Sequence, residues 1–134
     1  MDNNKLNEIL DKHKKWLNHE EGGVRADLRC SNLSGSDLSH SDLRGSDLSH
    51  SDLREANIDH SAWPLWRGSL KAYVDDRIAI QLLYHTLSVV QHSPYVSDEL
   101  KRALLTSGNI DVTNRFHRVE ECGKLEVYDN GNTI

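Results

Sequence analysis

The sequence is poor in the residues on which most compact cores and disulfide frameworks depend. Of its 134 residues 6% are aromatic, two are proline and two are cysteine, and the hydrophobic fraction is 37%. A conventional sandwich or α/β core would be thin at this composition, unless the apolar residues recur at regular positions. Cys30 and Cys122 lie far apart, so we expect two reduced thiols rather than a metal site or a disulfide.

The sequence also lacks basic excess and long hydrophobic runs. Its formal net charge is −5, which argues against nonspecific binding to nucleic acid or to an anionic membrane. Its first residues contain no apolar signal segment, and its hydrophobic runs are too short to cross a bilayer. We therefore predict a cytoplasmic protein that binds neither membranes nor nucleic acid directly, and that folds as one unit.

Sequence motifs for catalysis are missing as well. We find no general acid/base pair, glycine-rich phosphate loop, serine elbow or zinc-protease helix. The sequence therefore predicts a protein that is not an enzyme and needs no cofactor.

What the sequence does contain is a repeat of five residues. Residues 26–60 divide into ADLRC, SNLSG, SDLSH, SDLRG, SDLSH, SDLRE and ANIDH, and a degenerate eighth unit begins at Ser61. Neither a 3.6-residue helix nor a two-residue strand alternation keeps an apolar group on one face at this spacing. A chain that turns through about a right angle in each unit does so, and closes a square coil after four units. A disordered Ser/Asp linker is the alternative, but it gives no reason for a leucine at every fifth position.

The pattern of a small residue, Asp or Asn, and Leu or Ile resembles the pentapeptide-repeat family. This resemblance implies a right-handed quadrilateral β-helix. We therefore predict a mainly β solenoid of about two coils with helical caps at both ends. The flanks KHKKWLNHEEGGVRADL, WPLWRGSL and FHRVEECG also resemble those of small family members carried by phages and prophages.

The flanking sequences predict the caps that a short solenoid needs. An apolar stripe predicts an amphipathic N-terminal helix that ends before Gly22 and lies over the first coil. Trp66 falls where a small residue is required, so we expect the coil to end there. Further helices are predicted from Asp75 or Asp76 to about Val90, with stripes through Leu82 and Val89, and after Ser97. The predicted segments are a capping helix (1–25), the repeat (26–65), a helical cap (66–122) and a frayed or edge-like tail (123–134) with a turn at Asp129, Asn130 and Gly131.

The junction after the repeat is the first candidate ligand site. Trp63 and Trp66 offer faces for stacking, while Arg67 and Lys71 offer charge to a phosphate. If the C-terminal region folds back, Arg115, His117 and Arg118 approach the same place. The site would hold a nucleotide-like anion. The alternative is that both tryptophans only plug the open end of the coil.

The outward face of the repeat is the second candidate surface. With four units per coil, residues twenty apart stack about 4.8 Å apart, which places His40 over His60 and Cys30 over His50. A histidine pair without a third ligand predicts no metal site. The candidate partner surface comprises Asp37, Asp42, Asp47, Asp52, His40 and His60.

The resemblance implies a binding function. The main hypothesis is a non-catalytic phage or prophage accessory protein that binds a host or phage protein, as a counter-defence factor. One alternative is sequestration of a nucleotide-like anion at the junction. Another is binding to gyrase by the DNA mimicry of some family members, which the short scaffold and the diluting Arg29, Arg44 and Arg54 disfavour. Formation of a homodimer is left open.

Overall fold

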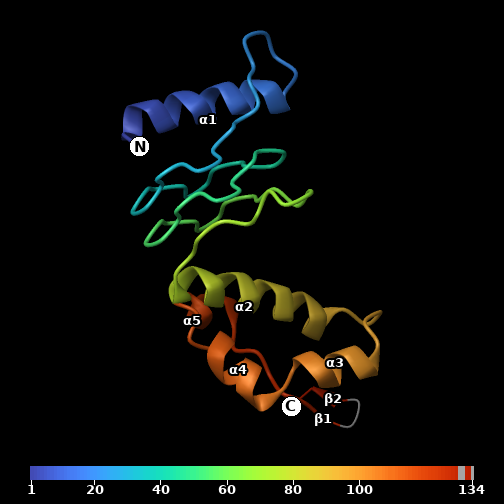
Figure 1. Ribbon diagram of the computed structural model, residues 1–134. Helices are drawn as coiled ribbons and strands as arrows, with labels where there is room; N and C mark the ends of the chain where they lie inside the picture. The colour runs from blue at the N-terminus through green and yellow to red at the C-terminus, as the bar shows by residue number, and fades with distance from the viewer. Residues whose placement is uncertain (130–131, 134) are drawn as a thin grey trace. The chain divides into compact units, whose positions relative to one another are not determined.

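A computed structural model describes residues 1–129 and 132–133 of the chain (Figure 1). The chain divides into two compact units, Met1–Asp75 and Asp76–Ile134. This boundary follows Asp75, rather than the predicted end of the repeat at residues 65 and 66. Folding of the whole chain as one unit stays a prediction.

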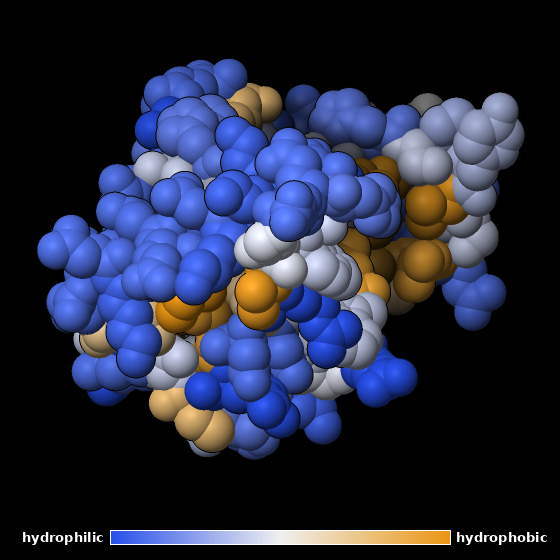
Figure 2. Space-filling view, turned by 90° about the horizontal axis from the view of Figure 1, so that it is seen from above, coloured by the Kyte–Doolittle hydropathy of each residue, from blue (hydrophilic) through white to orange (hydrophobic). Residues whose placement is uncertain are grey.

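The predicted N-terminal helix is present as α1, Asn3–Leu17. Its N-cap is Asp2, whose carboxylate accepts the Lys5 N–H at 2.8 Å. Leu6 and His13 are the buried residues of this helix. In Figure 1 the helix runs across one end of the repeat segment, and the face of the first unit seen from above in Figure 2 is mainly hydrophilic. The helix therefore covers the end of the repeat with a polar outer face, as solenoid caps must.

The repeat segment winds so that backbones twenty residues apart lie side by side. Isolated parallel bridges join Asp27 to Asp47, Asn32 to Asp52, Asp37 to Asn57 and Asp42 to Ala62. Leu28 N donates to Asp47 O at 2.9 Å, and the same bond recurs one unit later. The third-position side chains lie inside this coil: the six from Leu28 to Leu53 are 0% exposed, and Ile58 is 4% exposed. The five-residue period thus builds one continuous hydrophobic column.

Each corner of the coil is built from the same few residues. The fifth residue of every unit from 26 to 60 has a positive φ, which is 75° at Gly45 and 59° at His50. The next first-position N–H donates to the third-position carbonyl, as Ser46 N does to Leu43 O at 3.0 Å. The second-position Asp or Asn accepts the N–H two residues later, as Asp47 does from Ser49 N at 2.9 Å. The polar residues of the repeat therefore make its turns.

The prediction of a mainly β solenoid is wrong. Helices of 15, 17, seven, seven and four residues supply most of the regular secondary structure. Within the described residues, the named strands have two residues each, and both lie outside the repeat. The physical reason is the corner in every unit, because it interrupts each side of the coil after a single bridge and so prevents extended strands.

The coil also continues beyond the end that the sequence predicted. Leu48 N donates to Ser69 O at 2.9 Å, His50 N to Lys71 O at 2.6 Å, and Leu53 N to Tyr73 O at 2.8 Å. Asp52 forms a parallel bridge with Tyr73, 21 residues later instead of twenty. The expected stop at Trp66 is therefore wrong. The third turn is longer than the others, because the regular offset of 19 residues, as in Leu28 N to Asp47 O, grows to 21 at Ser69 and is 20 at Tyr73. The extra residues let the tryptophan leave the inward slot, and Ser69 is 3% exposed.

The second unit is helical with one short hairpin-like pair. It contains α2 (Asp76–His92), α3 (Asp98–Leu104), α4 (Ser107–Thr113), α5 (Val119–Cys122), β1 (Tyr128–Asp129) and β2 (Asn132–Thr133). The helix predicted after Ser97 is α3, and the Ser97 side chain accepts the Leu100 N–H at 3.1 Å. The strands pair antiparallel. Among the described residues, none of the helices is both long and hydrophobic enough to cross a membrane.

Two details of the second unit differ from prediction. The buried face of α2 follows Ile78, Gln81, Tyr84, Leu87 and Val90, whereas Leu82 and Val89 are 36% and 68% exposed. The tail predicted to be frayed or edge-like is not frayed throughout, because Leu125 and Tyr128 are buried in the core of this unit, and its short strands β1 and β2 pair with each other. Of the predicted turn, Asn130 and Gly131 lie outside the described residues.

His13 joins α1 to the coil through both ring nitrogens. The side chain is 0% exposed; Nδ1 accepts the Ala26 N–H at 3.0 Å, and Nε2 donates to Arg44 O at 2.8 Å. Only a neutral imidazole with its proton on Nε2 satisfies both bonds. Burial lowers the pKa of His13 below its usual 6.5, and the nearby Arg25 lowers it further. The hydrogen bond to Arg44 and the charge of Asp42 raise the pKa, but burial is the largest effect.

This geometry predicts acid sensitivity of the first unit. Because the folded pKa of His13 is lowered, the unfolded chain takes up a proton first as pH falls below 6.5, and stability falls with it. One proton gives a slope of at most about 1.4 kcal/mol per pH unit. We expect the urea midpoint, followed by fluorescence, to drop between pH 7 and 5. Carboxylates with a lowered pKa, such as that of Asp37, make stability depend on pH only at lower pH values, where they take up protons. H13Q should remove the slope, and H40Q should keep it; an unchanged slope in H13Q contradicts the assignment.

Candidate functional site

A pocket of about 500 Å³ opens on one side of the coil where its three turns stack. Residues 25–29 come from the first turn, residues 47–50 from the second, and residues 66–71 from the third. We call this the junction pocket. It is lined by Arg25, Ala26, Asp27, Arg29, Asp47, Ser49, His50, Trp66, Arg67, Gly68, Ser69 and Lys71.

Positive charge dominates this pocket although the chain as a whole is acidic. Its lining contains four cationic side chains, those of Arg25, Arg29, Arg67 and Lys71, against the carboxylates of Asp27 and Asp47. In the part of the chain that the structure describes, Arg25, Arg67 and Lys71 form no ion pair with a carboxylate. Three cations that form no ion pair, in one hollow, make it the strongest candidate site for an anion.

Arg29 differs from the other three because its charge is compensated locally. Its Nε and Nη2 donate to the two carboxylate oxygens of Asp27, both at 2.8 Å. The hydrogen bond from Arg29 lowers the pKa of Asp27 and, in return, raises the pKa of Arg29. Asp47 is engaged as well, since it accepts the backbone N–H of Ser49. The carboxylates of the pocket thus serve the turns, and neither forms an ion pair with Arg25, Arg67 or Lys71.

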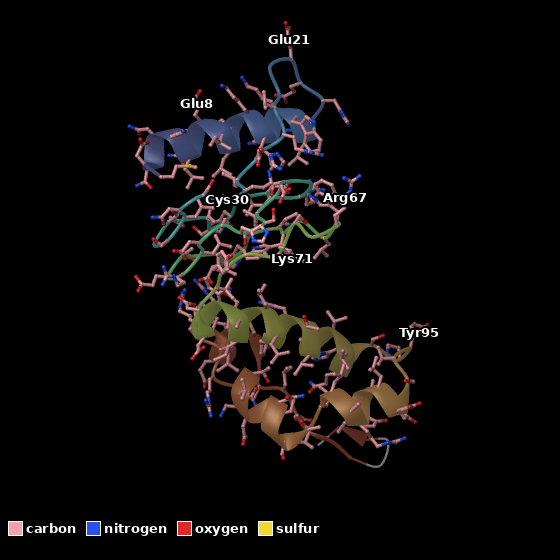
Figure 3. All side chains as sticks on the ribbon, viewed as in Figure 1. Glu8, Glu21, Cys30, Arg67, Lys71 and Tyr95 are labelled. Carbon is pink, nitrogen blue, oxygen red and sulfur yellow. The ribbon has the colours of Figure 1, made fainter. Side chains whose placement is uncertain are left out.

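An indole lies at the centre of the charged cluster. Trp66 is half-buried, and its Nε1 donates to Ser46 O at 2.9 Å. The guanidinium carbon of Arg25 lies 4.9 Å from the centre of the Trp66 ring, and that of Arg67 lies 5.2 Å from it. Figure 3 shows Arg67 and Lys71 on the last turn of the coil. Trp66 therefore lies against two of the cations.

The structure brings together part of the predicted ligand site. Trp66, Arg67 and Lys71 all line the junction pocket, but Trp63 does not, and its Nε1 donates to Ser61 Oγ at 2.8 Å. Sequence reasoning missed Arg25, Arg29 and His50. The twenty-residue period carried the signal, because it places residues 29, 49 and about 70 side by side.

The remaining predicted ligand residues belong to the second unit. Arg118 forms an ion pair with Glu121 at 2.9 Å, and His117 Nε2 lies 3.4 Å from Arg77 Nη2. Arg115 donates its backbone N–H to Val112 O. A role for Arg115, His117 and Arg118 at the junction stays a prediction.

The aspartates of the predicted partner surface have structural partners. Asp37 and Asp47 accept from Ser39 and Ser49, while Asp42 and Asp52 form two-point ion pairs with Arg44 and Arg54. The side-chain hydrogen bond from Arg54 lowers the pKa of Asp52 to about 2. A face whose carboxylates cap turns and pair with arginines has little of the unscreened charge of duplex DNA, so the arrangement gives DNA mimicry no support.

The stacking predicted for outward histidines is confirmed. The rings of His40 and His60 lie 4.8 Å apart and are inclined by 12°. Cys30 is exposed, and with His50 it lines a shallow hollow beside the junction pocket. Among the described residues, no group of three or more His, Cys, Asp or Glu side chains is placed to hold a metal ion.

Comparison with known proteins identifies the repeat. The family described as pentapeptide repeats matches residues 24–61 in eight copies. No curated protein and no solved structure matches the chain.

Proposed function

Since residues 24–61 make this chain a pentapeptide-repeat protein, we propose that it is a non-catalytic binding protein that holds a nucleotide-like anion in the junction pocket. The observation that carries the proposal is the group of three cations without carboxylate partners in a hollow of about 500 Å³. That volume lies within the range of small-molecule sites. A pentapeptide coil supplies a rigid wall, because its stacked backbones fix where each outward side chain begins.

The chemistry of the lining suits sequestration of a ligand. Arginine and lysine side chains donate to phosphate oxygens, and His50 offers a further polar contact. The pocket lies on the side of the coil and is half-open, so a ligand can enter without unfolding of the turns. Binding that needs no chemical step matches the general character of the family.

Calorimetric titration of the full chain with ATP and a panel of mono- and dinucleotides tests this proposal. We expect binding that weakens at least tenfold in the R25A and R67A variants and weakens as salt rises. R54A is the matched control, because Arg54 pairs with Asp52 and does not line the pocket. Equal affinity of R25A, R67A and R54A, or no binding of any nucleotide, would overturn the proposal.

A protein partner is our second proposal, and exposed hydrophobic residues of the second unit favour it. Tyr95 is 96% exposed and Val89 is 68% exposed, although both are large apolar side chains. Their exposure would be explained if this chain used them to bind a host or phage protein. The partner would have to bind the wild-type chain and lose affinity for a V89D/Y95D variant with unchanged circular dichroism. Equal binding of both proteins would exclude this face.

A further inference from the structure

Two arginines lie over one tryptophan at the edge of the junction pocket. The Arg25 and Arg67 guanidinium carbons lie 4.9 and 5.2 Å from the Trp66 ring centre. We propose that this pair recognises a phosphate group directly and that Trp66 is a positioning residue rather than a stacking platform for a base. This inference rests on the proposed function and adds that the phosphate group is the part of the ligand that the pocket binds.

The indole is held firmly enough to order the arginines. Its Nε1 donates to the carbonyl of Ser46 in the second turn, and Ser69 Oγ donates to the Trp66 carbonyl. Arg67 follows with φ at 48°, a left-handed conformation that fixes the direction in which its side chain leaves the backbone. The ring and the base of the Arg67 side chain are therefore set before any ligand arrives.

A guanidinium group over an aromatic ring keeps its donors available. A cation that lies flat on a ring contacts it through its face, and its N–H groups stay in the guanidinium plane, where they can still donate. Oxyanions such as phosphate bind along that edge, often through two hydrogen bonds. Because Arg25 and Arg67 form no ion pair among the described residues, their edges are available to a ligand. A base that stacked on the ring would compete with two guanidinium groups within 5.2 Å of its centre.

Helix α1 contributes to the same arrangement through a second indole. The Arg25 guanidinium carbon lies 5.9 Å from the Trp16 ring centre, and Trp16 stacks on His13 with centres 5.4 Å apart. His13 is the residue that anchors α1 to the coil. Arg25 is therefore placed between an indole of the helix and an indole of the third turn, and its position depends on both.

Titrations with phosphate compounds that have or lack a base test the inference. With the full chain at low salt, we expect inorganic tripolyphosphate to bind within about threefold of ATP, and adenosine to show no binding. If ATP binds but tripolyphosphate does not, the inference is overturned while the proposed function stands. If neither compound binds, both fall.

Variants of Arg67 and Trp66 separate the effect of the arginine's charge from the effect of its orientation by the ring. R67K keeps the charge but loses the planar edge, so we expect at least a tenfold weaker affinity for tripolyphosphate. W66F keeps an aromatic face but loses the Nε1 donor to Ser46 O, so it should lose affinity, though less than W66L, for which we expect a tenfold loss, at equal melting temperatures of the free proteins. R54A is again the control. Equal affinity of W66L and W66F, or of R67K and wild type, would overturn the positioning role.

Discussion

Replacing Leu43 with aspartate should unfold the first unit. Leu43 is 0% exposed, and its N–H donates to Ala62 O at 2.8 Å, so the side chain enters the hydrophobic column in the middle of the coil. An unpaired carboxylate there costs several kcal/mol, in addition to the roughly 2–5 kcal/mol of packing that a buried leucine provides. The sum reaches most of the roughly 5–15 kcal/mol by which domains of this kind are stable.

Tryptophan fluorescence measures this result for the first unit alone, because all three tryptophans, Trp16, Trp63 and Trp66, lie within Met1–Asp75. We expect L43D to show the emission of exposed indoles without denaturant. The control is L65D, since Leu65 is 87% exposed and should accept the charge with little change. A cooperative transition of L43D near that of the wild type would contradict the coil.

The second large effect is expected from replacing His13 with leucine. Leucine fills a similar space, but it leaves the Ala26 N–H and the Arg44 carbonyl without their partners at 3.0 and 2.8 Å. A buried polar group without a partner costs about 1–3 kcal/mol, so two of them predict a loss of roughly 2–6 kcal/mol. The lost free energy is that of the contact between α1 and the coil, so H13L should weaken the docking of this helix.

Urea unfolding followed by tryptophan fluorescence measures this loss. H40L is the matched control, because His40 is exposed and stacks only on His60. We expect its midpoint to change little. If H13L matched H40L, the two hydrogen bonds of His13 would carry no net stability, and the anchor assigned to α1 would be wrong. The H13L variant should also weaken anion binding, since Trp16 and Arg25 depend on the docked helix.

Much of the first unit could be predicted from the period alone. Leucines five residues apart share one environment only if the chain turns between them, and the observed column of buried side chains follows from that. The twenty-residue stacking of His40 on His60 followed from the same count. The predicted α1 followed from its apolar stripe. These features depend on local repetition, which a sequence displays directly.

Other features depended on contacts that no local pattern displays. The second-position aspartates looked like a charged binding face, but their carboxylates cap turns and pair with arginines two residues later. The coil continued past Trp66 because the backbone ladder tolerates a longer third turn when the tryptophan side chain can leave the inward slot. The buried face of α2 lay on Gln81 and Tyr84 because packing within the second unit, not hydrophobicity of the helix alone, chose it.

The sequence by itself determined that this chain forms a five-residue repeat with a leucine column and a helix at its start. Only the tertiary structure decided that Arg25 joins Trp66, Arg67 and Lys71 in one pocket and that Trp63 does not line it. The physical reason is that a repeat specifies which side chains point inward. Whether an outward cation belongs to a binding site depends instead on its neighbours on other turns. Whether a charge is paired or left for a ligand depends on where its carboxylates lie in space.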